Sequence, residues 1–267
     1  MQAPQQDQPT QDHPLARLIA HAAAGRFPVA DGRWRRVPPW RPGLEGIFSF
    51  TGHAVLALVP DLPDQRLVEL GVDGFGGATH PRLIAGLAGP DGWIDSLDVL
   101  LVSRGTGKTG GSGADLGGIA AGRAKAREGA ARVGDLTAAQ AGGGAASADA
   151  GPRLVDRPDL AAHHRAQFAA QIRDRPRILG YPDLRRSALA VISSGLAGLT
   201  ELGFELEPER RGAGGGTALV RDALSTIPAG QLVVAAVAPG NAASLRALLA
   251  AGFWPLGSMQ LFRRTPA

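Results

Sequence analysis

The sequence has no cysteine, two lysines, one tyrosine and no apolar run long enough to cross a bilayer. The absence of cysteine excludes disulfides, thiolate metal sites and a cysteine nucleophile. The first residues have neither the basic region nor the apolar core of a secretory signal. We therefore expect a soluble cytoplasmic protein that has no membrane partner.

The scarcity of lysine and tyrosine also explains the charge balance. The formal net charge is only +4 at pH 7, although the isoelectric point is near 10.5. Arginine keeps its charge at high pH, so only Lys108, Lys125, Tyr181 and the terminal amine titrate in that range. The high isoelectric point thus reflects missing titratable groups, and we expect no nucleic-acid partner.

Composition divides the 267 residues into four segments. Residues 1–12 are rich in Gln, Pro and Asp and predict a disordered tail. Residues 13–104 predict an N-terminal α/β region. Residues 105–152 are dominated by Gly, Ala and Ser and predict a flexible linker, with a helical pattern at 119–133. Residues 153–267 have the regular patterning of a folded domain.

In the N-terminal region, apolar periodicity predicts a helix, one or two strands, two short helices and a buried strand: 13–26, 47–60, 64–70, 81–87 and 96–103. We expect the intervening Trp- and Arg-containing residues 32–46 to be irregular. In the C-terminal region the predicted order is α-β-β-β-α-β-α-β-β, over 159–172, 177–180, 188–194, 199–207, 217–226, 232–237, 241–251, 253–257 and 259–263. The continuous apolar run at 232–237 is typical of a strand covered on both faces.

A glycine-rich turn joins a predicted strand to a predicted helix within residues 205–217, ELEPERRGAGGGT. Glycines let backbone N–H groups approach an anion closely, and a helix N-terminus adds unpaired donors and partial positive charge. Thr217 adds a hydroxyl group in the first helical turn. The pattern predicts a pyrophosphate site.

This turn resembles the acetyl-CoA loop of the GNAT acetyltransferases, Arg/Gln-Gly-x-Gly-x-Gly/Ala, which Arg211, Gly212, Gly214 and Gly216 match. Residues 241–253, NAASLRALLAAGF, resemble the second motif of the same family, and the resemblance covers residues 155–264. It implies an α/β (α+β) fold with a mixed, splayed central sheet flanked by helices, beside the additional N-terminal α/β region. It also implies transfer of an acetyl group from acetyl-CoA to a primary amine, without a metal.

The resemblance implies cofactor contacts from the end of the fourth strand, from the glycine turn and from the second motif. These residues are Phe204, Glu205, Leu206, Arg211, Gly212, Ala213, Gly214, Gly215, Gly216, Thr217 and Asn241, with Ser244 assisting. Asn241 is also a good helix N-cap, and the two roles are compatible.

The residues that move protons are less apparent. Where family members carry a tyrosine acid and a glutamate base, this sequence has Leu248 and Ala236. Glu201 and Glu205 should share one face of the fourth strand, and either is a candidate base or simply an exposed or ion-paired side chain. Tyr181 is a further catalytic candidate, or else an aromatic residue in a turn. A water relay stays open, and so does a protein that binds acyl-CoA without catalysis, in a regulatory role.

Three other patterns in the sequence bear on nucleotide, metal or nucleic-acid binding. Residues 103–109 imitate a nucleotide-binding loop ending in Lys108, but Val102 stands where that loop needs glycine. Nothing in the histidine spacing predicts a metal triad, and we expect His163 and His164 on different sides of a helix. Residues 31–43 contain Trp and Arg that could stack on bases, although such arginines more often cover partly buried aromatics.

The sequence leaves three points open. The region from Val155 supplies one helix and lacks the first strand of the family fold. Either residues 97–102 provide that strand, or the N-terminal half is a degenerate second GNAT-like unit. The acceptor amine could belong to a small molecule, an antibiotic, a protein N-terminus or a lysine. The oligomeric state is not predicted, a homodimer being one option.

Overall fold

The structure is a computed structural model that describes residues 13–108 and 153–265. These residues belong to one compact unit with a single mixed sheet of 11 strands. The helices pack on its faces, so the predicted mixed α/β class is confirmed. The predicted tail, most of the linker and the helix at 119–133 lie outside the described residues. None of the helices in the two described ranges has the length and apolarity that crossing a membrane requires.

The N-terminal region contains α1 (Pro14–Ala23), β1 (Trp34–Val37), β2 (Glu45–Phe50), β3 (His53–Ala57), α2 (Asp64–Glu69), α3 (Pro81–Ala88), β4 (Trp93–Ile94) and β5 (Asp98–Arg104). The prediction that 32–46 is irregular is wrong, because β1 pairs in parallel with β3. That pairing is non-local, and four residues of mixed polarity do not reveal it.

The C-terminal region contains β6 (Val155–Asp156), α4 (His164–Ile172), β7 (Asp174–Gly180), β8 (Leu189–Ser194), β9 (Thr200–Glu205), α5 (Gly215–Leu224), β10 (Leu232–Val237), α6 (Ala242–Ala250) and β11 (Trp254–Arg263). Three predictions need correction. The region has a short first strand of its own, because β6 pairs with β7. The first α-helix starts at His164 rather than at 159, because the His163 ring accepts the Arg165 N–H as an N-cap. The two expected final strands are one strand, with an irregularity between Pro255 and Gly257.

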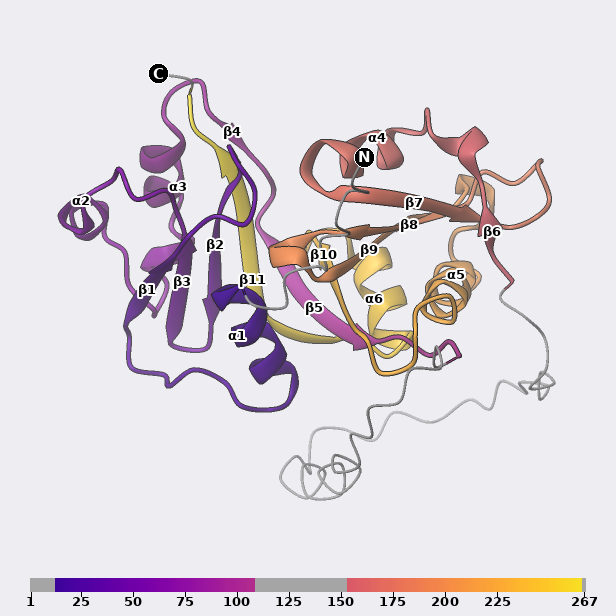
Figure 1. Cartoon of the computed structure of the whole chain (residues 1–267), viewed down its shortest axis with the longest axis horizontal. Helices are drawn as coiled ribbons and strands as arrows, with labels where there is room; N and C mark the ends of the chain where they lie inside the picture. The colour runs from indigo at the N-terminus through magenta and orange to yellow at the C-terminus, as the bar shows by residue number, and fades with distance from the viewer. Residues whose placement is uncertain (1–12, 109–152, 266–267) are drawn as a thin grey trace, which may run out of the picture. The chain divides into compact units, whose positions relative to one another are not determined.

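The two regions exchange strands. β5, from the N-terminal region, lies between β10 and β11 and pairs antiparallel with both. β11, from the C-terminal region, continues past β5 to pair with β2 (Figure 1). Each region therefore completes its sheet with a strand of the other, and residues 97–102 do enter the C-terminal sheet, although not as its first strand.

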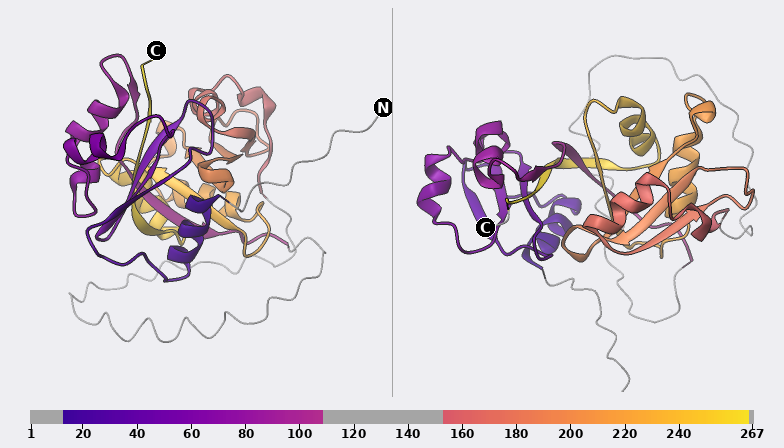
Figure 2. Two further views of the ribbon diagram at one scale, coloured as in Figure 1. Left: turned by 60° about the vertical axis from the view of Figure 1, so that its left-hand side comes forward. Right: turned by 90° about the horizontal axis from the view of Figure 1, so that it is seen from above.

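Alternating side chains of β8 define the two layers that flank the C-terminal strands. Leu189 and Val191 pack against α4, whereas Ala190, and Ala188 just before the strand, face the cluster formed with α5. α5 packs beside α6 on that second face, away from α4 (Figure 2). The ends of β9 and β10 are thus enclosed by helices from both sides.

Several Trp and Arg side chains of residues 31–43 make contacts within the fold. The Trp40 ring meets Phe48 edge-on at 5.8 Å between centroids. Arg36 pairs with Asp64 at 2.9 Å, and Arg41 pairs with Asp174 at 2.7 Å. The two arginines thus pair with aspartates, and the interpretation that arginines of this segment cover partly buried aromatics stays a prediction.

A buried ion pair connects the end of the chain to β2. Arg264 Nε lies 2.6 Å from Glu45 Oε2, and the Glu45 side chain is 4% exposed. We predict that Arg264→Ala lowers the free energy of unfolding by about 3 kcal/mol, because a buried carboxylate loses its charged partner. Urea unfolding measures this. As a control, Arg66→Ala breaks an exposed pair with Glu69 and should cost only about 0.3 kcal/mol. Equal losses in the two variants would contradict the prediction.

Candidate active site

The C-terminal sheet opens between β9 and β10. These parallel strands pair only at Thr200 with Val233 and at Glu201 with Val234. Beyond that point β9 stays bonded to β8 and β10 stays bonded to β5, so the strands diverge. The facing backbone edges of the diverging ends do not pair with each other, which makes them available to an extended ligand.

The glycine turn lies beside this opening and leads into α5. Gly212 and Gly214 have φ of 86° and 77°, a left-handed conformation that glycine adopts without strain. No backbone N–H from Gly212 to Thr217 donates a hydrogen bond to a protein acceptor within the described ranges. Gly216 lets α5 approach α6, since an added Cβ would lie 3.2 Å from the Ala247 Cβ. Six adjacent donors at the positive end of a helix can hold an anion.

A groove of about 630 Å³ runs along this turn. Ten of the predicted cofactor contacts line it: Phe204, Glu205, Leu206, Arg211, Gly212, Gly214, Gly216, Thr217, Asn241 and Ser244. Ala213 and Gly215 belong to the same turn but do not line the groove. The structure therefore brings together residues from β9, the glycine turn and α6 that are separated in the sequence.

Asn241 caps α6, which confirms the prediction that it is a helix N-cap. Its Oδ1 accepts the Ser244 N–H at 3.2 Å. Its amide nitrogen makes no hydrogen bond within the described part of the chain, and the residue lines the groove. The amide N–H groups are thus free to donate to a ligand while the oxygen caps the helix.

A second cavity, the inner cavity, continues from the groove and measures about 550 Å³. The two spaces share five lining residues: His164, Arg165, Phe204, Asn241 and Ser244. The other walls of the inner cavity come from α4, the diverging ends of β9 and β10, β11, and residues 95–98 of the N-terminal region. A ligand in the groove can therefore reach a second ligand in the inner cavity.

The two glutamates of β9 share one face of the strand, as alternation predicts. Glu201 is 5% exposed and pairs with Arg173 Nη2 at 2.7 Å. Its other oxygen accepts the Leu196 N–H at 2.9 Å. Both oxygens of Glu201 therefore have partners. Such a buried, paired carboxylate suits a structural role better than proton transfer.

Glu205 lies at the mouth of the groove among three basic side chains. Its Oε2 is 2.9 Å from His164 Nε2 and 3.7 Å from Arg165 Nε, and its Oε1 is 3.5 Å from Arg211 Nη2. Glu205 lines the groove but not the inner cavity. Glu205 is therefore better placed to orient the Arg211 side chain than to contact an acceptor in the inner cavity.

Tyr181 lies apart from both cavities. Leu248 and Ala236, at the positions of the family's proton-transfer residues, have side chains that cannot transfer a proton. Tyr181 donates to Asp222 Oδ2 at 3.1 Å, the Arg186 guanidinium stacks on its ring, and it lines neither cavity. Burial raises the pKa of the Tyr181 hydroxyl. Leu248 and Ala236 do line the inner cavity, and both are aliphatic.

Two acids in the inner cavity were missed by sequence reasoning. Asp95 precedes β5 and Asp98 is its first residue, and both line the cavity. Burial raises the pKa of Asp98 to about 6, and it also raises the pKa of Asp95. The only hint in the sequence is an acid at the start of a strand that is otherwise apolar, and its position depends on the exchange of β5.

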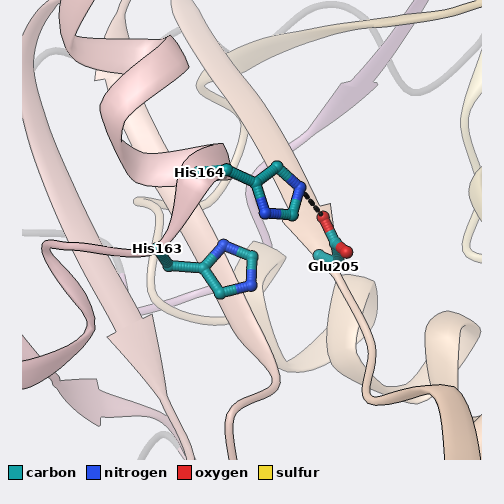
Figure 3. Close-up of side chains that lie close together, drawn as sticks. All are labelled: His163, His164 and Glu205. Carbon is teal, nitrogen blue, oxygen red and sulfur yellow. Dashed lines mark ion pairs between the residues drawn. The ribbon is translucent and has the colours of Figure 1, made fainter.

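His163, His164 and Glu205 could together hold a metal ion, because their ligand atoms lie within 4.8 Å of one another (Figure 3). The expectation that the two rings diverge is wrong. They stack at 4.4 Å, because His163 caps the helix instead of belonging to it. The Arg165 and Arg211 guanidinium groups near Glu205 already balance its charge and disfavour an added cation. Burial is the main cause that lowers the pKa of His163, and the neighbouring His164 lowers it further.

The segment that imitates a nucleotide loop uses its backbone donors internally. The N–H groups of Gly105, Thr106 and Gly107 donate to the carbonyl groups of Gln231, Leu224 and Ile227. They cannot also surround a phosphate. Residues 109–152 lie outside the described residues.

The sequence matches no protein-family model, and it matches no curated protein. Among solved structures it is similar to a GNAT-family acetyltransferase from Novosphingobium aromaticivorans, at 15% identity and a TM-score of 0.36, over 66% of this chain and 69% of the other. It is also similar to a GNAT-family acetyltransferase from Colwellia psychrerythraea, at 12% identity and a TM-score of 0.31, over 65% of this chain. The match spans 57% of that second protein. Both neighbours belong to the family that the motifs resemble, but likeness at this level fixes neither fold nor activity.

The raised pKa of Asp98 makes a prediction about stability. A carboxyl group whose pKa is raised on folding holds its proton longer in the native state than in the unfolded state. Its contribution to stability therefore falls as the pH rises from about 4 to about 6. Asp98→Asn should raise the free energy of unfolding at pH 7 by about 1 kcal/mol, after allowance for solvent screening, and by much less at pH 4. Urea unfolding of both proteins at the two pH values measures this. A variant destabilised at pH 7 would contradict it.

Proposed function

We propose that this protein is an acetyl-CoA-dependent N-acyltransferase that acts on a primary amine. The observation that supports this most directly is the continuity of two spaces at the opening between β9 and β10. One is a groove along a turn whose backbone N–H groups, from Gly212 to Thr217, have no protein acceptor among the described residues. The other is a cavity lined by carboxyl groups. The first suits a pyrophosphate-bearing thioester, and the second suits an amine.

The residues of the groove fit acetyl-CoA in their chemistry. The backbone N–H groups of Gly212 to Thr217 would hold the pyrophosphate, and Arg211 would add positive charge. The free edge of β9 would bond the peptide-like arm, and the Asn241 amide would donate to it. The bound molecule supplies an acyl group activated as a thioester, and backbone donors at the strand opening would polarise its carbonyl group.

The acceptor would enter through the inner cavity, whose walls bring it to the opening between β9 and β10. Attack requires loss of protons from the nitrogen and gain of a proton by the departing sulfur. Leu248 and Ala236 can supply neither, and Glu201 is occupied by Arg173. Proton transfer must therefore use other residues of the cavity or water.

A second candidate function is acyl-CoA binding without catalysis. The observation that favours it is the side chain of Leu248, which packs with 2% exposure where the family resemblance implies a tyrosine acid. Release of free CoA in the presence of amines separates the two functions. Tight binding of acetyl-CoA with no CoA release from any amine would favour the non-catalytic protein.

We predict that Arg211→Glu and Gly214→Glu each weaken acetyl-CoA binding by at least about 100-fold, because each puts an anion and added bulk beside the bound pyrophosphate. Isothermal titration calorimetry with acetyl-CoA measures this. Arg210→Glu makes the same charge change one residue away from the groove lining, and Lys108→Ala changes a residue outside it. Both controls should bind within about threefold of the unchanged protein. Absence of any heat with CoA and acetyl-CoA would overturn the proposed function.

A further inference from the structure

Carboxyl groups outnumber guanidinium groups in the lining of the inner cavity, where Arg165 and Arg173 are the arginines. Its acidic members are Asp95, Asp98 and Glu201. Arg173 neutralises Glu201, whereas neither Asp95 nor Asp98 forms an ion pair within the described part of the chain. Each accepts one hydrogen bond from Ser96: its N–H donates to Asp95, and its hydroxyl donates to Asp98 at 2.7 Å. Two carboxyl groups that have no ion-pair partner in a confined space attract a cation.

The cavity also limits what the cation can be. Its volume of about 550 Å³ is in the usual range of pockets for small molecules. Apolar side chains from α4 and β11 complete its walls: Phe168, Ile172, Met259 and Leu261. A compact amine with an apolar body matches this lining better than a lysine held on a protein surface.

Asp98 is fixed in position by the exchanged strand. It pairs with Met259 across β5 and β11, and the next residue, Val99, pairs with Val237 at the end of β10. Val237 and Ala238 line the cavity beside the opening of the sheet. The Asp98 carboxyl group is thus held one residue from the strand end at which the proposed thioester would lie.

We propose that the inner cavity receives a small cationic amine and that Asp98 is the group that takes its proton. The inference rests on the proposed function and deepens it. The ammonium group gives one proton to the Asp98 carboxylate, which later releases it to water. The nitrogen lone pair then forms the C–N bond to the acyl carbon as the C–S bond breaks. The second proton of the nitrogen passes through water to the thiolate, giving an amide and a free thiol.

The charged and titratable groups around Asp98 define the expected pH dependence. They are Asp95 before β5, His164 and Arg165 in α4, Arg173 at the C-cap of α4, and Glu201 in β9. Burial outweighs the basic members, so Asp98 becomes a carboxylate only as the pH rises through about 6. The value of kcat/KM should therefore rise over that interval and level off above it.

The test compares the full chain with Asp98→Asn, using 2-phenylethylamine and 1,4-diaminobutane as acceptors and a ten-residue lysine peptide for comparison. Binding of acetyl-CoA is measured first by calorimetry, and release of free CoA is then followed from pH 5 to pH 9. We expect faster turnover of a small amine than of the peptide. In Asp98→Asn, kcat should be at least about 100-fold lower, and the rise of kcat/KM near pH 6 should be lost. Acetyl-CoA should bind both proteins equally.

Asp91→Asn is the matched control, because Asp91 is an exposed aspartate of the same segment that does not line the cavity. It should retain the rate and pH profile of the unchanged protein. Equal rates in Asp98→Asn, or a rise of kcat/KM near pH 6 that persists in it, would overturn the role of Asp98. Faster turnover of the peptide would overturn the substrate class. Failure of acetyl-CoA to bind would instead refute the proposed function, before any amine is added.

Discussion

The position of β5 between β10 and β11 is the constraint on which the rest of the site depends. β5 makes ladder hydrogen bonds on both sides, and its side chains enter two cores: Leu100 and Val102 on one face, and Leu101 on the other. It holds β10 away from β11, and β10 in turn diverges from β9 after two paired residues. A strand from the N-terminal region thus shapes the opening that the C-terminal region uses.

The groove depends on a second constraint, the backbone donors of the glycine turn, which have no protein acceptor in residues 13–108 and 153–265. Residues 212–214 are exposed and residues 215–217 are half-buried, so these N–H groups can bond either to solvent or to a ligand with acceptor oxygens. The left-handed conformations at Gly212 and Gly214 orient these donors, and the contact of Gly216 with Ala247 sets the spacing of α5 and α6. Side chains contribute less here than the course of the main chain.

Local patterns in the sequence predicted what local forces determine. The apolar run 232–237 matches β10 at both ends. The predicted cap residue Asn241 accepts the Ser244 N–H with its Oδ1. Contacts between distant segments could not be predicted in this way. β1 forms only because β3 pairs with it, and Asp98 reaches the cavity only through the exchange of β5. The stacking of His163 on His164 depends on where α4 begins, and element ends are the least determined feature of a sequence pattern.

The same geometry explains why the residue that accepts the proton should lie on β5 rather than on β9. On β9 the face that looks into the inner cavity carries Glu201, whose carboxylate is bound by Arg173 and by the Leu196 N–H. Removing it from that pair would leave a buried guanidinium without a partner, so its charge is committed to the fold. Among the described residues the Asp98 carboxyl group accepts a hydrogen bond from the Ser96 hydroxyl alone, and it lines the same cavity from β5. A carboxylate that is buried but not neutralised can exchange a proton near neutrality, whereas a paired one cannot.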